Sequence, residues 1–203
     1  PQSVFYGSNA SSGVINIITR TGSVGTQYGG SVEVGNGYAL SGNVSTRTDR
    51  GGLAFSFSDR DDAGFDASGD GGEKDGTRRR TLGLSADWKA TDDLTLGFTI
   101  RRSDEDYDYD VNSFSASTPD EYVVDEPNAL SEREETTAQV YADYQMLDGR
   151  LTHRLSYSLS RFDQFSEDPI QGAYALDGET RSLKYRGSFA LDGGTVADAR
   201  QLL

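Results

Sequence analysis

The sequence predicts an all-β fold, an antiparallel transmembrane β-barrel fragment of about eight strands that follows the end of another small unit. Three observations support this prediction. Apolar and polar residues alternate with a period of two in segment after segment, short and long connections alternate between these segments, and an almost continuous β-branched run (Val14, Ile15, Ile17, Ile18) precedes them. Such a run is typical of a strand that is buried on both faces.

The expected strands are recognised by apolar residues at every second position. The weaker ones lie near residues 27–36, 38–48 and 52–60, and the clearer ones cover residues 82–90, 94–101, 139–146, 151–160 and 183–191. One face of each carries Leu, Phe, Tyr, Val or Ala, and the other carries Thr, Ser, Gln, Asp or Arg. Most reach the ~9–11 residues of a tilted bilayer crossing. The polar faces suit a wet or plugged lumen better than a dry core.

The connections indicate which end of the sheet is which. Tight turns are expected at residues 35–37, 49–52, 91–93, 148–149 and 192–194, and long polar loops at residues 61–78, 104–134 and 164–178. A soluble sandwich has no reason to place every long loop at one end. An outer-membrane barrel does, because its periplasmic turns are short and its external loops are long.

Composition excludes several classes of protein. A hydrophobic fraction of 34% and the absence of any long apolar run exclude a membrane helix, but not a barrel that hides apolar residues at alternate positions. No cysteine is present, so disulfides and thiolate metal sites are excluded. The net charge of −14 argues against nucleic acid as a partner. Because the chain starts at Pro1 without a signal peptide, we expect it to be a fragment of a longer protein.

The opening segment, residues 1–22, has a characteristic order of residues. A turn at Tyr6-Gly7-Ser8 leads to a small-residue step around Gly13, then to the apolar strand, which ends at Thr19-Arg20. This segment resembles the end of the plug domain in TonB-dependent outer-membrane receptors. The resemblance implies two units: residues 1–22 as the C-terminal end of the plug, and residues 23–203 as the N-terminal part of the barrel.

The resemblance also implies a function. Receptors of this family lie in the outer membrane of Gram-negative bacteria and take up a scarce metal-chelate ligand, such as a ferric siderophore, haem or cobalamin. Energy reaches them through a TonB-type coupling protein, which pulls on a short box that is missing from this chain. The implied partners are therefore the coupling protein, a small ligand and membrane lipid, and the implied activity is binding and transport rather than catalysis.

Acidic residues are concentrated between Asp104 and Glu135. Within this stretch four aspartates recur at a spacing of two (Asp104, Asp106, Asp108, Asp110), and an extended strand would project them from one face. Calcium is the hard cation that such a row would bind, although Tyr109 stands where an EF-hand needs glycine. The vitamin B12 receptor of the same family has a similar acidic segment that binds calcium. A solvated acidic loop is the alternative. A second group (Asp59, Asp61, Asp62, Asp66, Asp70) could add ligands.

No catalytic motif accompanies these residues. The one histidine, His153, shares a strand face with Leu151 and Leu155, so we expect it to be an interfacial residue that points towards lipid near the periplasmic end. No Gly-x-Ser-x-Gly elbow is present. The sequence therefore predicts a protein that is not an enzyme.

Two other functions stay open on this sequence. A passive porin or structural barrel would share the alternating strands, but it would have no plug strand before the first barrel strand. A secreted, calcium-binding acidic β protein would explain the aspartates, but one sheet could not cover so many apolar faces.

Overall fold

The computed structural model describes residues 24–69, 71–118, 121–170 and 172–199. The predicted end of a plug, residues 1–22, lies outside this part of the chain. The described residues form ten strands: β1 (Gly25–Gly35), β2 (Gly37–Thr48), β3 (Gly51–Asp62), β4 (Thr77–Lys89), β5 (Leu94–Asp108), β6 (Val111–Asn112), β7 (Val123–Val124), β8 (Leu130–Met146), β9 (Leu151–Asp168) and β10 (Gly172–Phe189). They include no helix that is long and apolar enough to cross a membrane.

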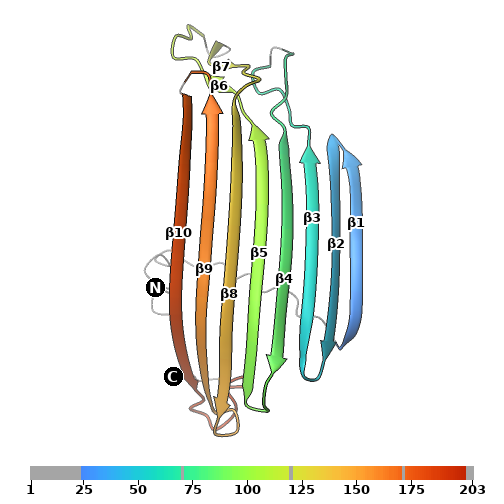
Figure 1. Cartoon of the computed structure of the whole chain (residues 1–203), viewed down its shortest axis with the longest axis vertical. Helices are drawn as coiled ribbons and strands as arrows, with labels where there is room; N and C mark the ends of the chain where they lie inside the picture. Colours follow the sequence, from blue (N-terminus) through green and yellow to red (C-terminus); the bar gives the residue numbers. More distant parts are fainter. Residues whose placement is uncertain (1–23, 70, 119–120, 171, 200–203) are drawn as a thin grey trace.

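Eight of the strands form one antiparallel sheet in the order β1-β2-β3-β4-β5-β8-β9-β10, and β6 pairs with β7 in a separate two-stranded sheet (Figure 1). The predicted all-β, antiparallel architecture is confirmed. Each strand of the large sheet pairs with the next strand of the same sheet along the chain, as in a meander. Among the described residues β1 and β10 are edges, and they do not pair with each other.

The register gives the sheet two chemically different faces. Because residues opposite each other on antiparallel strands point to the same side, one rung of the first face reads Leu53, Ala86, Phe98, Val140, Tyr157 and Leu183. The adjacent rung, whose side chains point to the opposite face, reads Ser45, Ala54, Ser85, Thr99, Gln139, Ser158 and Ser182. We call the first the apolar face and the second the polar face.

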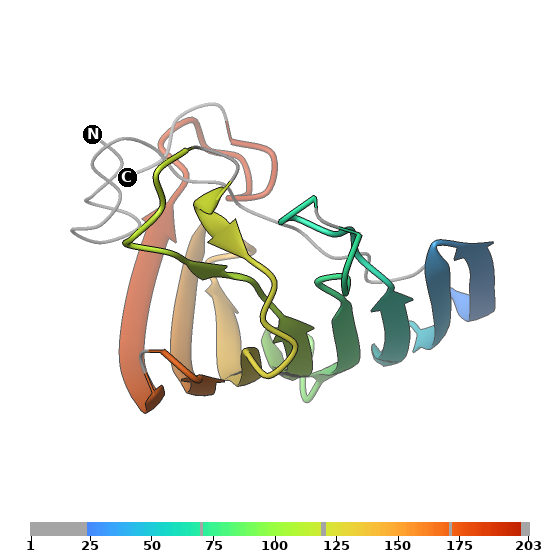
Figure 2. The same ribbon diagram turned by 90° about the horizontal axis from the view of Figure 1, so that it is seen from above.

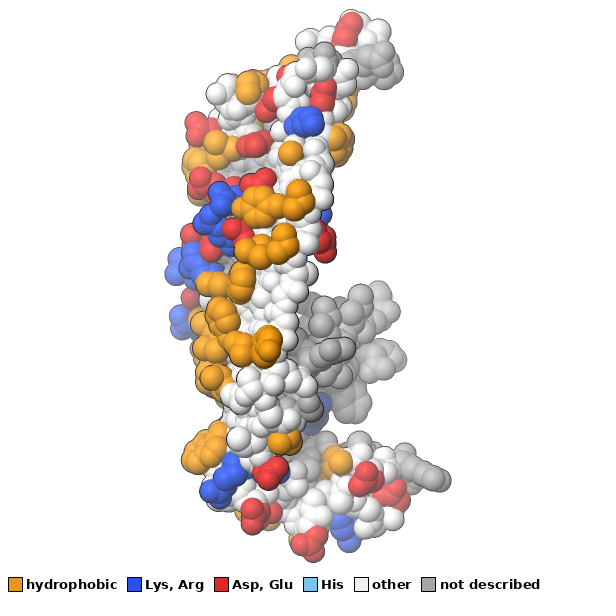
Figure 3. Space-filling view, turned by 90° about the vertical axis from the view of Figure 1, so that its right-hand side faces the viewer, with side chains coloured by type: hydrophobic (Ala, Val, Ile, Leu, Met, Phe, Trp, Pro, Cys, Tyr) orange, Lys and Arg blue, Asp and Glu red, His pale blue; other side chains and the backbone are white. Residues whose placement is uncertain are grey.

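The apolar face carries hydrophobic side chains over only part of its height. On β5 they run from Leu94 to Ile100, and the next residue on that face is Arg102, which pairs with Asp104 and with Glu134 at 2.9 Å each. Figure 3, which views the molecule from the β1 edge, shows hydrophobic side chains in orange, and Lys and Arg side chains in blue beside acidic side chains in red. The apolar belt is thus bordered by a charged band towards the long loops.

The apolar face has no second layer among the described residues. The only buried hydrophobic residues of the described chain are Val111, Ala129 and Ala190, whereas on the apolar face Leu183 is 71% exposed, Trp88 56% and Val140 55%. Water-soluble monomers rarely expose an apolar patch that crosses a whole sheet. This face needs an apolar environment that the described chain does not supply.

The sheet is curved, and seen from above its strands follow an arc (Figure 2). The two long connections, residues 63–76 between β3 and β4 and residues 109–129 between β5 and β8, lie over its concave side. The short turns after β2, β4 and β8 lie at the opposite end (Figure 1). The predicted separation of long loops from short turns holds for these connections.

The third predicted long loop, residues 164–178, is wrong. β9 continues to Asp168 and β10 begins at Gly172, so this connection is a tight turn. In the turn the backbone amide of Ile170 donates to Asp168 Oδ1 at 2.8 Å. The other two loops are shorter than predicted. The first is shortened because β3 extends to Asp62 and β4 begins at Thr77, and the second because β5 extends to Asp108 and β8 begins at Leu130.

The first hairpin offers a matched test of backbone geometry. Gly37 has a φ of +132°, and a Cβ there would overlap the carbonyl oxygen of Asp61, whereas a Cβ on Gly35 meets nothing within 4 Å. We expect Gly37→Ala to cost about 1–3 kcal/mol of unfolding free energy, since strain at such a φ is of that size. Gly35→Ala should be close to neutral. Equal denaturation midpoints for the two variants would contradict this assignment.

The open edges predict how the isolated chain behaves. Among the described residues no further strand pairs with the outer side of β1 or of β10, and hydrocarbon does not tolerate unpaired backbone N–H and C=O groups at such edges. We expect the 203-residue chain on its own neither to insert into bilayers nor to bind ligand. Refolding into lipid vesicles, followed by electrophoresis with and without heating, measures this. A heat-modifiable, protease-resistant product would overturn the expectation.

Candidate cation site in the two long loops

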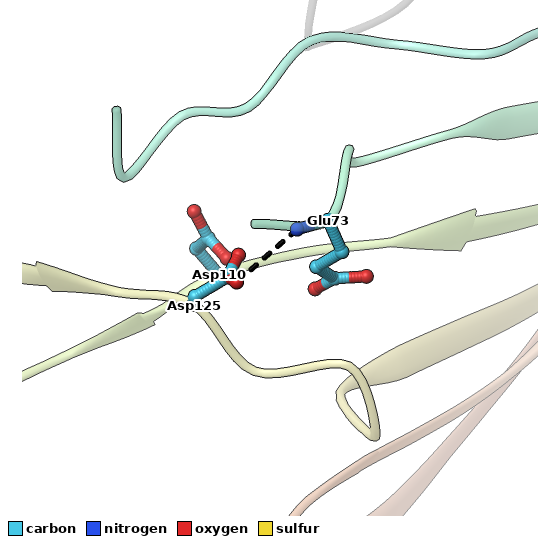
Figure 4. A group of neighbouring side chains, drawn as sticks. All are labelled: Glu73, Asp110 and Asp125. Carbon is cyan, nitrogen blue, oxygen red and sulfur yellow. Dashed lines mark hydrogen bonds between the residues drawn. The ribbon is translucent and has the colours of Figure 1, made fainter. Parts of the chain in front are cut away.

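The two long loops meet at a group of three carboxylates. Glu73 comes from the loop between β3 and β4, and Asp110 and Asp125 come from the two ends of the β6–β7 hairpin. One carboxylate oxygen from each lies within 4.8 Å of the others. The backbone amide of Glu73 donates to Asp125 Oδ2 at 3.2 Å, and Figure 4 shows this bond and the three side chains. We call Glu73, Asp110 and Asp125 the carboxylate triad.

Backbone hydrogen bonds hold both loops in place around the triad. In the first loop the Asp75 amide donates to the Phe65 carbonyl at 3.1 Å, and the Asp108 amide reaches the Gly76 carbonyl at 3.0 Å. In the second the Tyr109 amide donates to Ala129, which is 1% exposed. These bonds hold the chain shortly after Glu73 and directly before Asp110.

An Asx-type turn shapes the tip of the first loop. Asp66 Oδ1 accepts from the Gly69 amide at 2.6 Å, and Asp66 Oδ2 accepts from the Gly71 amide at 2.7 Å. Short polar side chains that bond backbone amides a few residues later favour such turns. With the Ser68 hydroxyl as the largest contribution, these bonds lower the pKa of Asp66. Asp66 is therefore already satisfied, unlike the triad.

Several oxygens of the acidic group have no hydrogen bond. Among the described side chains, buried carboxylate oxygens without a hydrogen bond occur at Glu73 (Oε1), Asp75 (Oδ1), Asp110 (both oxygens), Asp125 (Oδ1) and Asp59 (Oδ1). Five of these six oxygens belong to the triad or to the neighbouring Asp75. No ion pair to a described Lys or Arg involves these four residues. Buried polar oxygens normally have hydrogen-bond partners, so a group of unpaired carboxylate oxygens at one place indicates that another donor or a cation binds there.

The pKa values of the group are raised. Burial is the largest cause for Glu73, and the charges of Asp125, Asp75 and Asp110 raise its pKa further. Burial followed by the charge of Asp110 raises the pKa of Asp75. Burial also raises the pKa of Asp110, and the nearby Glu126 amide offsets only part of that rise. Like charges with little compensation disfavour the ionised form.

Such an arrangement can bind a hard divalent cation. Carboxylate oxygens are the ligands that calcium prefers, and calcium accepts six to eight oxygens in flexible geometry. The three side chains come from two loops, which are joined here by the hydrogen bond from the Glu73 backbone amide to Asp125. A cation would cancel the repulsion and would join the loops more firmly.

The four predicted aspartates do not act as one row. Asp104 lies on the apolar-face side of β5 and pairs with Arg102. Asp106 is exposed on the same side, and Asp108 ends the strand, where its charge adds to those that raise the pKa of Glu73 and Asp75. Asp110 alone enters the triad.

The second predicted acidic group contributes no triad member. Asp59 faces Arg78 and Arg80 at 3.8 and 3.7 Å, and Asp62 accepts from the Gly64 amide at 3.1 Å. Asp70 lies outside the described residues. The two triad members that the sequence did not indicate are Glu73 and Asp125. They are single acidic residues in polar loops, and no spacing rule distinguishes them from their neighbours.

His153 lies where its strand parity predicts. It stands on the apolar face of β9 near the short turns, opposite Gly187 and Tyr144. Its Nδ1 lies 2.7 Å from the Tyr185 hydroxyl, and the two rings stack with centroids 6.0 Å apart. A polar ring edge that is bonded to a tyrosine at the border of an apolar belt is typical of an interfacial residue.

The raised pKa values predict opposite pH dependences with and without calcium. An acid whose folded-state pKa exceeds its unfolded value loses stability as the pH rises through the folded pKa. In a chelator, protection of residues 63–76 from amide exchange should therefore be greatest near the usual carboxyl pKa of about 4 and fall as the pH rises. With calcium, which needs ionised ligands, protection should rise with pH. Identical profiles would contradict the cation site.

Comparisons with known proteins add no assignment. No model of a protein family matches the sequence, and no curated protein is similar enough to count as a match.

Proposed function

We propose that this chain is part of the barrel wall of a TonB-dependent outer-membrane receptor, which binds a scarce metal-chelate ligand and takes it up with energy from a TonB-type coupling protein. The observation that carries the proposal is the apolar face, which crosses all eight strands of the large sheet and has no layer of described residues against it. The opening segment adds the resemblance to a plug domain.

The height of the apolar belt fits lipid as its environment. On β8 the apolar positions run from Ala138 to Met146, and on β9 from Leu151 to Leu159. At 3.4 Å per residue this is about 27 Å along the strand, close to the ~25 Å band of outer-membrane barrels before tilt is considered. Trp88, Tyr144 and Tyr185 near the short turns fit the aromatic girdle at the periplasmic interface.

The polar, concave face would then line the lumen. Its charged groups form an ordered network near the short turns: Arg47 passes over Gly52 to pair with Asp87, and Arg154 stacks on Tyr141 with its Cζ 4.2 Å from the ring centroid. Such a face tolerates water or a polar plug but not lipid. The two long loops that lean over it would restrict and shape the external mouth, with calcium ordering them through the triad.

These 203 residues contain no cysteine, so single introduced cysteines test location and orientation directly once any cysteine elsewhere in the full-length protein is replaced by serine. In the full-length protein expressed in a Gram-negative host, Ser117→Cys in the second long loop should react with a membrane-impermeant maleimide on intact cells. Asp92→Cys, in the turn between β4 and β5, should react only after permeabilisation. Labelling of both positions on intact cells, or recovery of the protein in the soluble fraction, would reject the membrane proposal.

A passive porin is separated from a coupled receptor by energy dependence. A receptor of the proposed kind accumulates its ligand only while the inner membrane is energised, so a protonophore should abolish uptake and leave surface binding intact. A porin shows the same solute flux with and without the protonophore. Flux that does not depend on the protonophore would be consistent with a barrel, but it would reject the proposed dependence on a coupling protein.

A further inference from the structure

Three arginines gather on the polar face just below the long loops. Arg79 on β4, Arg101 on β5 and Arg133 on β8 line a depression of about 80 Å³, together with Ser103, Glu105 and Glu135. The site lies between the triad above and the serine- and threonine-rich rungs below. It is a local excess of positive charge in a chain whose net charge is −14.

Two of the arginines have acidic partners. Arg79 forms an ion pair with Glu105. Arg133 lies 3.8 Å from Glu135 and also stands over the Phe162 ring, with its Cζ 5.8 Å from the centroid. The Arg133 contact with Glu135 is long for a hydrogen-bonded pair, so most of the guanidinium donors of Arg133 remain available.

Arg101 has no ion pair with any described acidic residue. Its neighbours on the same rung are Gly83, which has no side chain, and Thr137, which has no charge. The arginine is also exposed, so it can meet a solute on the polar face. Three guanidinium groups against two carboxylates leave one uncompensated positive charge in the depression.

The opening segment cannot supply the missing negative charge. Residues 1–23 contain no Asp or Glu, and Arg20 carries their only side-chain charge at neutral pH. An uncompensated guanidinium offers a rigid fork of donors that matches pairs of carboxylate, phosphate or catecholate oxygens. The chemistry of the depression therefore selects an anion.

We propose that Arg101, flanked by Arg79 and Arg133, is an anion subsite of the ligand path, and that the ligand is an anionic chelate with carboxylate or catecholate oxygens. An uncharged ligand, such as cobalamin or a neutral trihydroxamate chelate, gives these guanidinium groups no counter-charge. This inference rests on the proposed function, because it takes the concave face to be the path of the ligand.

The test uses the full-length protein in outer-membrane vesicles and four probes: ferric citrate and a ferric tris-catecholate, which are anionic, and cyanocobalamin and a neutral ferric trihydroxamate. We expect an anionic probe to bind. Arg101→Ala should weaken its binding about ten- to a hundredfold, the usual value of hydrogen bonds to a charged group. Arg101→Lys keeps the charge but loses the forked set of donors, so its affinity for the anionic probe should lie between those of the wild type and Arg101→Ala. Arg102→Ala, one residue along and on the opposite face, is the matched control and should bind normally.

Three results would overturn the subsite: binding of only the uncharged probes, no binding of either anionic probe, or equal affinity for wild type and Arg101→Ala. Maleimide labelling at Ser117→Cys in the same vesicles reports separately on the proposed function. If the protein is correctly inserted but fails these binding tests, only the proposed anion subsite is rejected. A protein that is absent from the outer membrane removes the receptor proposal.

Discussion

An Asp110→Asn variant should lose the calcium-dependent protection of residues 63–76 and 109–129 against proteolysis. The substitution leaves one carbonyl oxygen but removes a charge from the triad, in which both oxygens of Asp110 lack a hydrogen bond. We expect wild-type affinity for calcium in the range of about 10⁻⁴–10⁻³ M that extracellular modules show. The loss on substitution should exceed about tenfold, or on the order of 1.4 kcal/mol.

The same variant should behave in the opposite way without calcium. Neutralising Asp110 removes one of the charges that raise the pKa of Glu73 and Asp75, so repulsion between the loops falls. In a chelator the variant loops should therefore be cut more slowly than the wild-type loops. Asp106→Asn is the control, because Asp106 is exposed and lies outside the triad. If the wild-type loops are cut at the same rate with and without calcium, the proposed cation site is rejected.

A second large effect is expected on the apolar face. Phe98→Arg places a charge at the middle of the belt, on a rung flanked by Ala86 and Val140. Arginine on the lipid face of a barrel costs about 2–4 kcal/mol at the bilayer midplane. We expect the full-length variant to unfold at a correspondingly lower urea concentration in vesicles, or to accumulate outside the membrane.

Thr99→Arg provides the matched control for this substitution. Thr99 is the next residue of β5 and points to the polar face, between Ser85 and Gln139. The same added charge there meets water and polar groups, so the unfolding midpoint should change little. Equal destabilisation by the two arginines would show that the apolar face does not contact lipid.

The sequence predicted the strands well where the two faces meet different environments. On β4, β5, β8 and β9 the apolar belt forces alternation. The predicted ranges 82–90, 94–101, 139–146 and 151–160 lie in strands, except for Ala90, which follows the end of β4. Prediction failed where the strands continue beyond the belt. Residues 164–168 and 172–178 carry polar or mixed side chains on both faces, so the period-two signal disappears there.

The candidate site shows a similar division. Asp110 belonged to a recognisable aspartate row, and its neighbour along the row, Asp108, also lies near the triad. Glu73 and Asp125 are 52 residues apart and meet only because the loops cross the same part of the concave face. A single sequence contains no periodic or local signal for such a meeting. For Arg101 the decisive fact, a glycine opposite it, depends on register.

The meander order also bears on how this sheet folds. Every strand of the large sheet pairs with the next sheet strand along the chain, so each new strand adds to an edge that its predecessor has just formed. Contacts that are local in sequence close small loops and form quickly. The costly step is the pairing of β5 with β8 across residues 109–129, although doubling a loop adds only about 0.6 kcal/mol. The small β6–β7 hairpin lies within residues 109–129 and shortens the flexible span between β5 and β8. The segment that carries Asp110 and Asp125 therefore also favours the pairing of β8 with β5.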